Sequence, residues 1–109
     1  MALKQDFYQK VYNLVKKIPR GKVSTYGHIG RALTGGNSAR LVGMALNNCP
    51  DPQTPCHRVV NRNGELTGAP HFDHPDMMRD LLENEKVTFK DGRVDMKKHL
   101  WVPQSQVNY

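Results

Sequence analysis

The sequence has little cysteine and no long hydrophobic run. Its 109 residues include two cysteines, Cys49 and Cys56, which are too few for a disulfide scaffold, so any function of these thiols is expected to be chemical. No stretch approaches the roughly 20 apolar residues that a membrane-spanning helix needs. The N-terminus, Met-Ala-Leu-Lys-Gln-Asp, lacks the apolar region of a signal peptide. We therefore expect a cytoplasmic protein that makes no membrane contact.

Acidic residues are scarce in the first half of the chain. Residues 1–50 hold eight lysines and arginines against one acid, Asp6, a net charge of +7, whereas residues 51–109 hold eight basic and nine acidic residues. A basic excess confined to one half favours a polyanionic partner such as nucleic acid. It also fits a surface whose charge serves solubility. The length and the lack of internal repeats or low-complexity linkers predict a single domain over 1–109.

Hydrophobic periodicity predicts three helices in the first half. The first is expected over 6–17 with Asp6 as its cap, the second over 25–33 with Ser24 as its cap, and the third over 38–47. The inward face of the third helix is predicted to carry Leu41, Val42, Ala45 and Leu46. Two helices separated by a short glycine turn are typical of the helix-turn-helix DNA-binding motif. A helical hairpin packed in a core has the same pattern.

The second half predicts short strands around one helix. A connection with three prolines, 48–55, leads to a short buried strand, Val59-Val60. A helix is expected over 75–84, with Pro75 at its first position. A hairpin is expected over 87–96, because Lys90-Asp91-Gly92 is typical of a tight turn. The sequence therefore predicts a mostly α fold with a small β component, a winged helix-turn-helix DNA-binding domain.

The run Pro55-Cys56-His57-Arg58-Val59 is the most informative part of the sequence. A thiol is a strong nucleophile as the thiolate, and a neighbouring imidazole or cation lowers its pKa. On the turn that the prolines predict, the side chains of Cys56 and His57 can converge. A third group should orient the imidazole, and the candidates are Glu65, Asp73, Glu83 and Glu85. Two alternatives stay open: a packed cysteine beside a surface histidine, and a metal site that adds Cys49 and His71 or His74.

Four segments resemble the O6-alkylguanine-DNA alkyltransferase family. The run from Pro55 to Val60 is similar to the family's active-site signature. Residues 21–27 (Gly-Lys-Val-Ser-Thr-Tyr-Gly) resemble the entry into its helix-turn-helix, and 39–46 (Ala-Arg-Leu-Val-Gly-Met-Ala-Leu) its recognition helix. Residues 81–85 (Leu-Leu-Glu-Asn-Glu) resemble the segment of its active-site glutamate. The segments follow the expected order, unlike a chance six-residue match, and the resemblance is to the family's C-terminal DNA-binding and active-site domain.

The resemblance implies a role for each matching residue. Cys56 corresponds to the cysteine that accepts an alkyl group from the exocyclic oxygen of guanine, His57 to the base that activates it through a water, and Glu85 to the carboxylate that orients the histidine. Arg40 corresponds to the arginine that fills the space of the displaced base, and Tyr26 to the tyrosine that promotes its rotation beside the 3′ phosphate. Further DNA contacts are implied for Lys22, Ser38, Ala39, Gly43 and Arg58, and support of the active site for Asn48 and Pro55.

The resemblance also implies the partner and the course of the reaction. The recognition helix of this family lies in the minor groove, and the alkylated base leaves the duplex at a cost of a few kcal/mol. The thioether formed on Cys56 has no easy leaving route, so the protein is consumed in one turnover and needs no cofactor and no metal. We expect a monomer that binds double-stranded DNA containing O6-alkylguanine, associated with the nucleoid in a bacterium or nuclear in a eukaryote.

Two segments depart from the family pattern. Cys49 stands where the family usually has an asparagine, with Asn48 one place earlier, and 67–75 replaces a Tyr-Ser-Gly-Gly-like lid. A second hypothesis is therefore an alkyltransferase-like protein, which marks the lesion for nucleotide excision repair proteins without repairing it. Such proteins typically carry tryptophan or alanine at the position of Cys56. A third hypothesis, a winged-helix transcription regulator, leaves Cys56, His57 and Glu85 unexplained, and their retention favours alkyl transfer.

Overall fold

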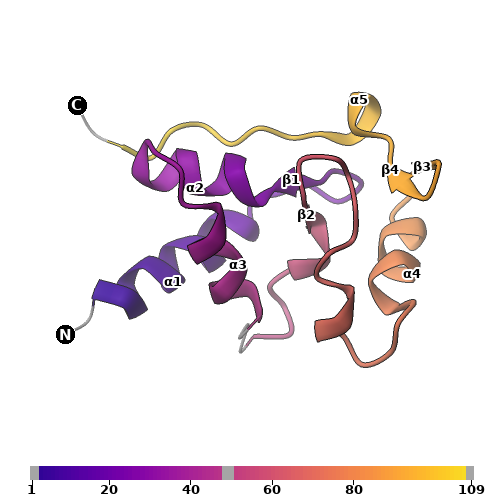
Figure 1. The fold of residues 1–109 in the computed structure, drawn as a ribbon, viewed down its shortest axis with the longest axis horizontal. Coiled ribbons are helices and arrows are strands. Elements are labelled where there is room, and N and C mark those ends of the chain that lie inside the picture. The colour runs from indigo at the N-terminus through magenta and orange to yellow at the C-terminus, as the bar shows by residue number, and fades with distance from the viewer. Residues whose placement is uncertain (1–2, 48–50, 108–109) are drawn as a thin grey trace.

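The computed structural model describes residues 3–47 and 51–107, so Asn48 and Cys49 lie outside the described residues. The helices are α1 (Leu3–Val15), α2 (Tyr26–Thr34), α3 (Ala39–Asn47), α4 (Met77–Asn84) and α5 (Met96–His99), with 3-10 helices η1 (Cys56–Arg58) and η2 (Ala69–His71). The strands are β1 (Ser24–Thr25), β2 (Val59–Val60), β3 (Phe89–Lys90) and β4 (Arg93–Val94) (Figure 1). The mostly α fold with a small β component is confirmed. No helix in the described part is long and apolar enough to cross a bilayer.

Helices α1, α2 and α3 pack around the first of two hydrophobic cores (Figure 1). Its fully buried side chains include Val11, Val15, Ile29 and Val42, which recur at helical spacing within their helices. The hydroxyl of Tyr12 donates to the carbonyl of Ala45 at 2.7 Å and ties α1 to α3. Helices α2 and α3 approach closely at Gly30, where an added Cβ would lie 2.9 Å from the backbone of Ser38. This pair, joined by a short turn, is the predicted helix-turn-helix.

Three predictions about the first half need correction. Helix α1 begins at Leu3, so Asp6 lies in its first turn and is not its cap. The cap of α2 is Thr25, whose hydroxyl accepts from the backbone N–H of His28 at 3.0 Å, while Ser24 belongs to β1. Leu41 is 46% exposed, because Val42 takes the inward direction and neighbouring helical residues point about 100° apart.

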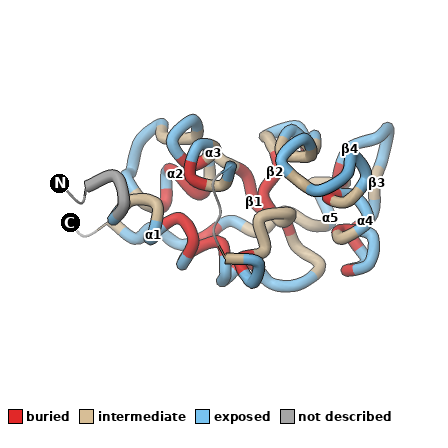
Figure 2. Tube along the Cα trace, turned by 90° about the horizontal axis from the view of Figure 1, so that it is seen from below, coloured by how far each residue is buried: buried red, intermediate tan, exposed pale blue. Residues whose placement is uncertain are grey.

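A two-stranded parallel ribbon lies between the two cores. Ser24 of β1 is paired with Val59 of β2. Successive side chains of a strand point to opposite faces, so Val59 packs in the first core while Val60 packs in the second. Both valines are fully buried, as is most of the ribbon (Figure 2). The ribbon therefore fixes the segment just before β2, which carries Cys56, relative to both cores.

The second core forms between this ribbon, α4 and the hairpin. Its buried members are Val23, Val60, Met78, Leu82, Val87 and Val94. Helix α4 begins at Met77, two residues after the predicted Pro75, with Asp76 as its N-cap. The hairpin of β3 and β4 is confirmed, and its turn residues Asp91 and Gly92 have φ of 55° and 78°, as a two-residue type I′ turn requires.

The chain then returns along α2 toward the N-terminal end of the molecule (Figure 1, yellow). The backbone N–H of Trp101 donates to Val23 at 2.7 Å, and that of Gln106 donates to Ala32 at 2.6 Å. Trp101 packs on the first core. The last segment therefore joins both halves of the structure.

Candidate active site and DNA-binding face

Cys56 lies at the start of a tight 3-10 turn that leads directly into β2. Pro55 precedes it with φ −79° and is the N-cap of η1. The N–H of Cys56 donates to the carbonyl of Thr54 at 2.8 Å, and that of Arg58 donates to Pro55 at 2.9 Å. The turn that the prolines predicted is therefore present, and Pro55 supports it as expected from its position. Cys56 and His57 both face one cavity.

This cavity, called the lesion pocket because the resemblance implies that an alkylated base enters it, has a volume of about 360 Å³, within the range of small-molecule sites. Its floor holds Cys56, His57 and Thr54, and Tyr26 lines it from the start of α2. Its other walls come from the end of α3, the 51–52 segment, the loop around η2 and the first turns of α4: Leu46, Asn47, Asp51, Pro52, Gly68, His71, Phe72, Met77 and Leu81. Segments far apart in the sequence thus enclose one mostly apolar space around a thiol.

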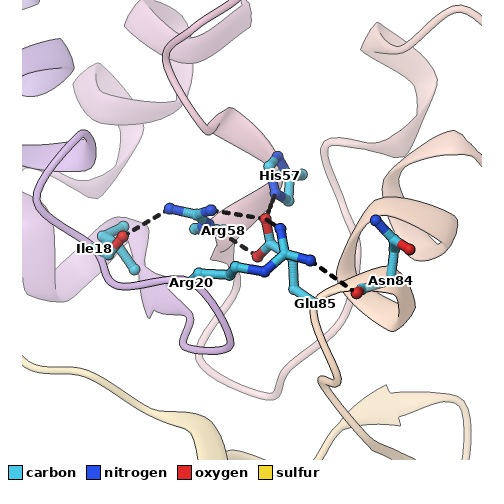
Figure 3. A network of polar contacts seen from close by, with 6 residues as sticks. All are labelled: Ile18, Arg20, His57, Arg58, Asn84 and Glu85. Carbon is cyan, nitrogen blue, oxygen red and sulfur yellow. Dashed lines mark hydrogen bonds and ion pairs between the residues drawn. The ribbon is translucent and has the colours of Figure 1, made fainter.

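The carboxylate of Glu85 lies behind His57 and is almost fully buried (Figure 3). Its Oε2 accepts from Nε2 of His57 at 2.9 Å and from Nη2 of Arg58 at 2.7 Å, and its Oε1 accepts from Nε of Arg58 at 2.9 Å. Arg20 lies at the outer side, with Nη1 3.9 Å from Oε2 of Glu85 and Nη2 donating to the carbonyl of Asn84 at 3.1 Å. One carboxylate is therefore surrounded by an imidazole and two guanidinium groups.

The protonation states follow from this arrangement. Burial acts to raise the pKa of Glu85, but the hydrogen bonds from Arg58 and His57 outweigh it and lower the pKa to about 2. Burial lowers the pKa of His57 from 6.5, although the bond to Glu85 opposes that change. Near neutral pH, Glu85 is therefore an anion and His57 is uncharged. An uncharged His57 that bonds Glu85 through Nε2 carries its proton there and keeps Nδ1 as a base.

The structure selects one of the four acids proposed to orient the imidazole. Glu65 accepts from the amide of Asn61 at 2.8 Å, and Glu83 pairs with Arg79 at 3.5 Å on the exposed side of α4. Asp73 is exposed. Glu85 alone among these acids bonds His57 in the described residues, as the resemblance implied.

Arg58 is placed differently from the expected DNA contact. Its guanidinium makes two bonds to Glu85, and its Nη1 donates to the carbonyl of Ile18 at 2.8 Å, with a side chain only 15% exposed (Figure 3). The guanidinium group of Arg58 is therefore directed into the protein. Arg58 therefore fixes Glu85 relative to the end of the first helical segment instead of reaching outward.

The exposed face of α3 carries a cation beside apolar side chains. Arg40 is exposed in the first turn of α3, and among the described residues no hydrogen bond or ion pair holds it. Leu41 and Met44 on the same helix are 46% and 39% exposed, two of the three exposed large hydrophobic residues in the described part. An exposed apolar patch of this kind marks a contact surface.

The other residues with implied DNA contacts lie around the helix-turn-helix. Ser38 precedes α3 and shares a 2.8 Å hydroxyl contact with Thr34, and Ala39 opens the helix. An added Cβ on Gly43 would lie 3.9 Å from the ring of Tyr26, so this residue lies beside the tyrosine. Lys22 is set apart from them, because its ammonium donates to the carbonyl of Lys98 at 3.1 Å in the C-terminal part.

A polar groove beside Tyr26 was missed in the sequence. It has a volume of about 720 Å³ and is lined by Thr25, Tyr26, Gly27, His28, Arg31, Asn37, Ala39, Asn61, Arg62 and Asn63, without a carboxylate. Arg31 and Arg62 belong to α2 and to the turn after β2, and within the described part neither guanidinium group makes a hydrogen bond or ion pair. No sequence signal placed Arg62 beside α2, because the two segments meet only in the folded structure.

A family model and individual known proteins relate this chain to the same family. The family model described as "6-O-methylguanine DNA methyltransferase, DNA binding domain" matches residues 6–87. Alkyltransferase-like protein 1 of Schizosaccharomyces pombe is 35% identical over 104 residues, covering 90% of this chain and 96% of that protein. The DNA base-flipping protein of Escherichia coli is 36% identical over 107 residues, covering 93% of this chain and 78% of that protein.

Solved structures show the same fold. The S. pombe alkyltransferase-like protein in complex with damaged DNA containing O6-carboxymethylguanine superposes with a TM-score of 0.78 at 36% identity, over 91% of this chain and 97% of that one. The Mycobacterium tuberculosis OGT in complex with DNA gives a TM-score of 0.67 at 38% identity, over 74% of this chain and 50% of that one. These likenesses confirm the winged helix-turn-helix fold.

Proposed function

Because the chain belongs to the 6-O-methylguanine DNA methyltransferase family, we propose that it binds double-stranded DNA containing O6-alkylguanine, takes the damaged base into the lesion pocket and transfers the alkyl group to Cys56. The observation that carries this proposal is the pocket itself, where Cys56 and His57 line one mostly apolar cavity and Glu85 fixes the imidazole from behind at 2.9 Å. The transcription-regulator hypothesis gives this set of residues no role.

The transfer proceeds by displacement at the alkyl carbon. Nδ1 of His57 takes the thiol proton of Cys56 through a water, while Nε2–H of His57 stays bonded to Glu85. The thiolate attacks the alkyl carbon, so the S–C bond forms as the bond between that carbon and the guanine O6 breaks. The electron pair of the broken bond stays on the base, which takes up a proton at N1 and is thereby restored to guanine within the DNA strand. A thioether on Cys56 remains, and the protein acts once.

The DNA-facing side supplies the other requirement, removal of the base from the stack. Arg40 extends from the exposed face of α3 and fills the space that the base leaves, which offsets part of the unstacking cost. The phosphate backbone follows the polar groove beside α2, where Arg31 and Arg62 attract it without competition from a lining carboxylate. Tyr26 lines both this groove and the lesion pocket, at the point where the nucleotide rotates.

Intact-mass analysis tests the chemical step. After incubation with a duplex containing one O6-methylguanine, the protein should gain the mass of one methylene, and Cys56→Ala should show no gain. The Cys56→Ala protein should still prefer this duplex to the undamaged one. An unchanged mass of the wild-type protein despite selective binding would overturn the transfer and retain the binding.

A second candidate function is lesion sensing without transfer. It is favoured by similarity over nearly the whole length of an alkyltransferase-like protein, whereas the chain spans only half of the M. tuberculosis OGT. The altered lid over 67–75 points the same way. In this case Cys56 packs against the base, and the complex recruits nucleotide excision repair proteins. In both cases we propose that a monomer binds the lesion, because the apolar side chains of α3 are then covered by DNA and not by a second copy.

A further inference from the structure

Two buried hydroxyl groups in the described part of the chain have no hydrogen-bond partner, those of Ser24 and Thr54. A hydroxyl removed from water without a new partner lowers the stability of the fold. Ser24 belongs to β1 and is not among the residues around the lesion pocket, whereas Thr54 lines that pocket with Cys56 and His57. The two hydroxyls therefore have different surroundings although both are unpaired.

Every other polar group of Thr54 is already used. Its backbone N–H donates to the carbonyl of Asp51 at 3.0 Å, and its carbonyl accepts from the N–H of Cys56 at 2.8 Å. The residue is only 5% exposed, so solvent hardly reaches its side chain. Thr54 is thus held two residues before the cysteine, as a residue of the cavity lining whose buried hydroxyl is its one polar group without a partner.

We propose that the Thr54 hydroxyl recognises the extrahelical purine through a hydrogen bond formed in the lesion pocket. This inference rests on the proposed function and adds a specificity-determining residue to it. Leu46, Phe72 and Leu81 make much of the surrounding wall apolar and cannot orient the polar edge of a base. A hydroxyl both donates and accepts, so it suits a ring nitrogen as well as an exocyclic amine. Its missing partner is then supplied by the ligand, and a base that supplies none leaves it unpaired.

The replacement Thr54→Val tests this role because it exchanges the hydroxyl for a methyl group of similar size. Measured in a Cys56→Ala background, so that the lesion is not consumed, Thr54→Val should weaken binding to an O6-methylguanine duplex roughly fivefold, the loss of about one neutral hydrogen bond. The same replacement should leave the melting temperature of the unbound protein unchanged or raise it by about 2–8 °C, because a buried unpaired hydroxyl is removed. A purely structural threonine would lower the melting temperature instead.

Two controls separate recognition from packing. Ser24→Ala removes the other unpaired hydroxyl and should likewise not lower the melting temperature, but it should leave lesion affinity unchanged. Thr54→Ser retains the hydroxyl and should keep the affinity. Two base analogues identify the atom that the hydroxyl bonds. O6-methylhypoxanthine lacks the 2-amino group, and 7-deaza-O6-methylguanine lacks the ring N7. If the hydroxyl bonds one of these two groups, Thr54→Val should not change the affinity for the duplex whose base lacks that group.

The outcomes are distinct. If Thr54→Val binds the O6-methylguanine duplex as tightly as its parent, or is less stable without a loss of lesion preference, this inference is wrong and the proposed function stands. If the parent protein shows no preference for the damaged duplex, the proposed function is wrong and the inference falls with it.

Discussion

The arginines of this protein fall into two groups that the structure uses in opposite ways. Arg58 and Arg20 surround the buried carboxylate of Glu85, and each of the three guanidinium nitrogens of Arg58 donates to an acceptor inside the protein. Arg40, Arg31 and Arg62 are exposed on the helix-turn-helix side, and their guanidinium groups make no hydrogen bond or ion pair with the described residues. The first group holds the candidate active site in place in the absence of a ligand, whereas the charges of the second group remain available to a ligand.

The comparison predicts that stability and DNA binding can be damaged separately. Changes around Glu85 leave buried charges without partners, which is costly in the fold itself. Changes on the exposed face of α3 remove contacts that exist only in the complex.

Replacement of Glu85 by glutamine should have the largest effect, on stability. It removes the buried anion from two partly buried partners, His57 and Arg58, and should lower the free energy of unfolding by about 3 kcal/mol, measured by denaturant titration. The matched control is Glu83→Gln, which removes an exposed ion pair with Arg79 and should cost less than about 0.5 kcal/mol. Similar small losses from both variants would show that the buried network does not support the fold.

Arg40→Ala should act on DNA binding and leave the melting temperature unchanged. We expect at least roughly tenfold weaker binding to an O6-methylguanine duplex, because the variant loses both the charge and the group that fills the emptied base position. Fluorescence anisotropy measures the affinity. Arg93→Ala on the hairpin, also exposed, is the control for loss of charge alone. Equal small effects of the two variants would contradict an arginine that enters the duplex.

Replacements at Leu41 and Val42, which are neighbours on α3, should separate effects on DNA binding from effects on stability more sharply. Leu41→Ala should weaken DNA binding about threefold, through lost apolar contact, without loss of stability. Val42→Ala should do the reverse and lower the free energy of unfolding by about 2 kcal/mol, because it opens a cavity in the first core. A stability loss from Leu41→Ala would mean that this side chain packs within the protein.

Acid should reduce stability through the same network, in two ranges of pH. Burial lowers the pKa of His57 from 6.5, so the unfolded chain binds a proton first and stability falls as the pH drops below 6.5. The pKa of Glu85, lowered from 4.5 to about 2, adds a second loss as the pH falls from 4.5 toward 2. Thermal unfolding between pH 7 and 5 measures the first loss. His57→Gln should show less of it, and an equal loss would assign the titration to other groups.

Local patterns in the sequence predicted most of the elements and much of the site. The three helices, the buried Val59-Val60 strand and the Asp91-Gly92 hairpin follow from periodicity and turn chemistry, which are local properties. The residues alone left four acids as partners of His57, and the family resemblance pointed to Glu85. Only the fold brings residues 57 and 85 together, because their contact depends on how α4 packs against η1.

The errors have a common physical cause. Leu41 was predicted to be inward because it is apolar, but a DNA-binding face also uses apolar side chains. The resemblance implied a DNA contact for Arg58, but its guanidinium is bonded to a buried carboxylate. Residue type indicates what a side chain can do, and the partner that it meets through tertiary packing decides which use is made.

The single peptide step from Val59 to Val60 sends one side chain into each hydrophobic core, three residues after Cys56. Neither half can loosen without disturbing the anchor of the other, so we expect heat to melt the described structure in one cooperative transition despite its two cores. Loss of structure in either core would then change the surroundings of Cys56, so the accessibility of this thiol to an alkylating reagent should rise at the same temperature at which the whole structure melts.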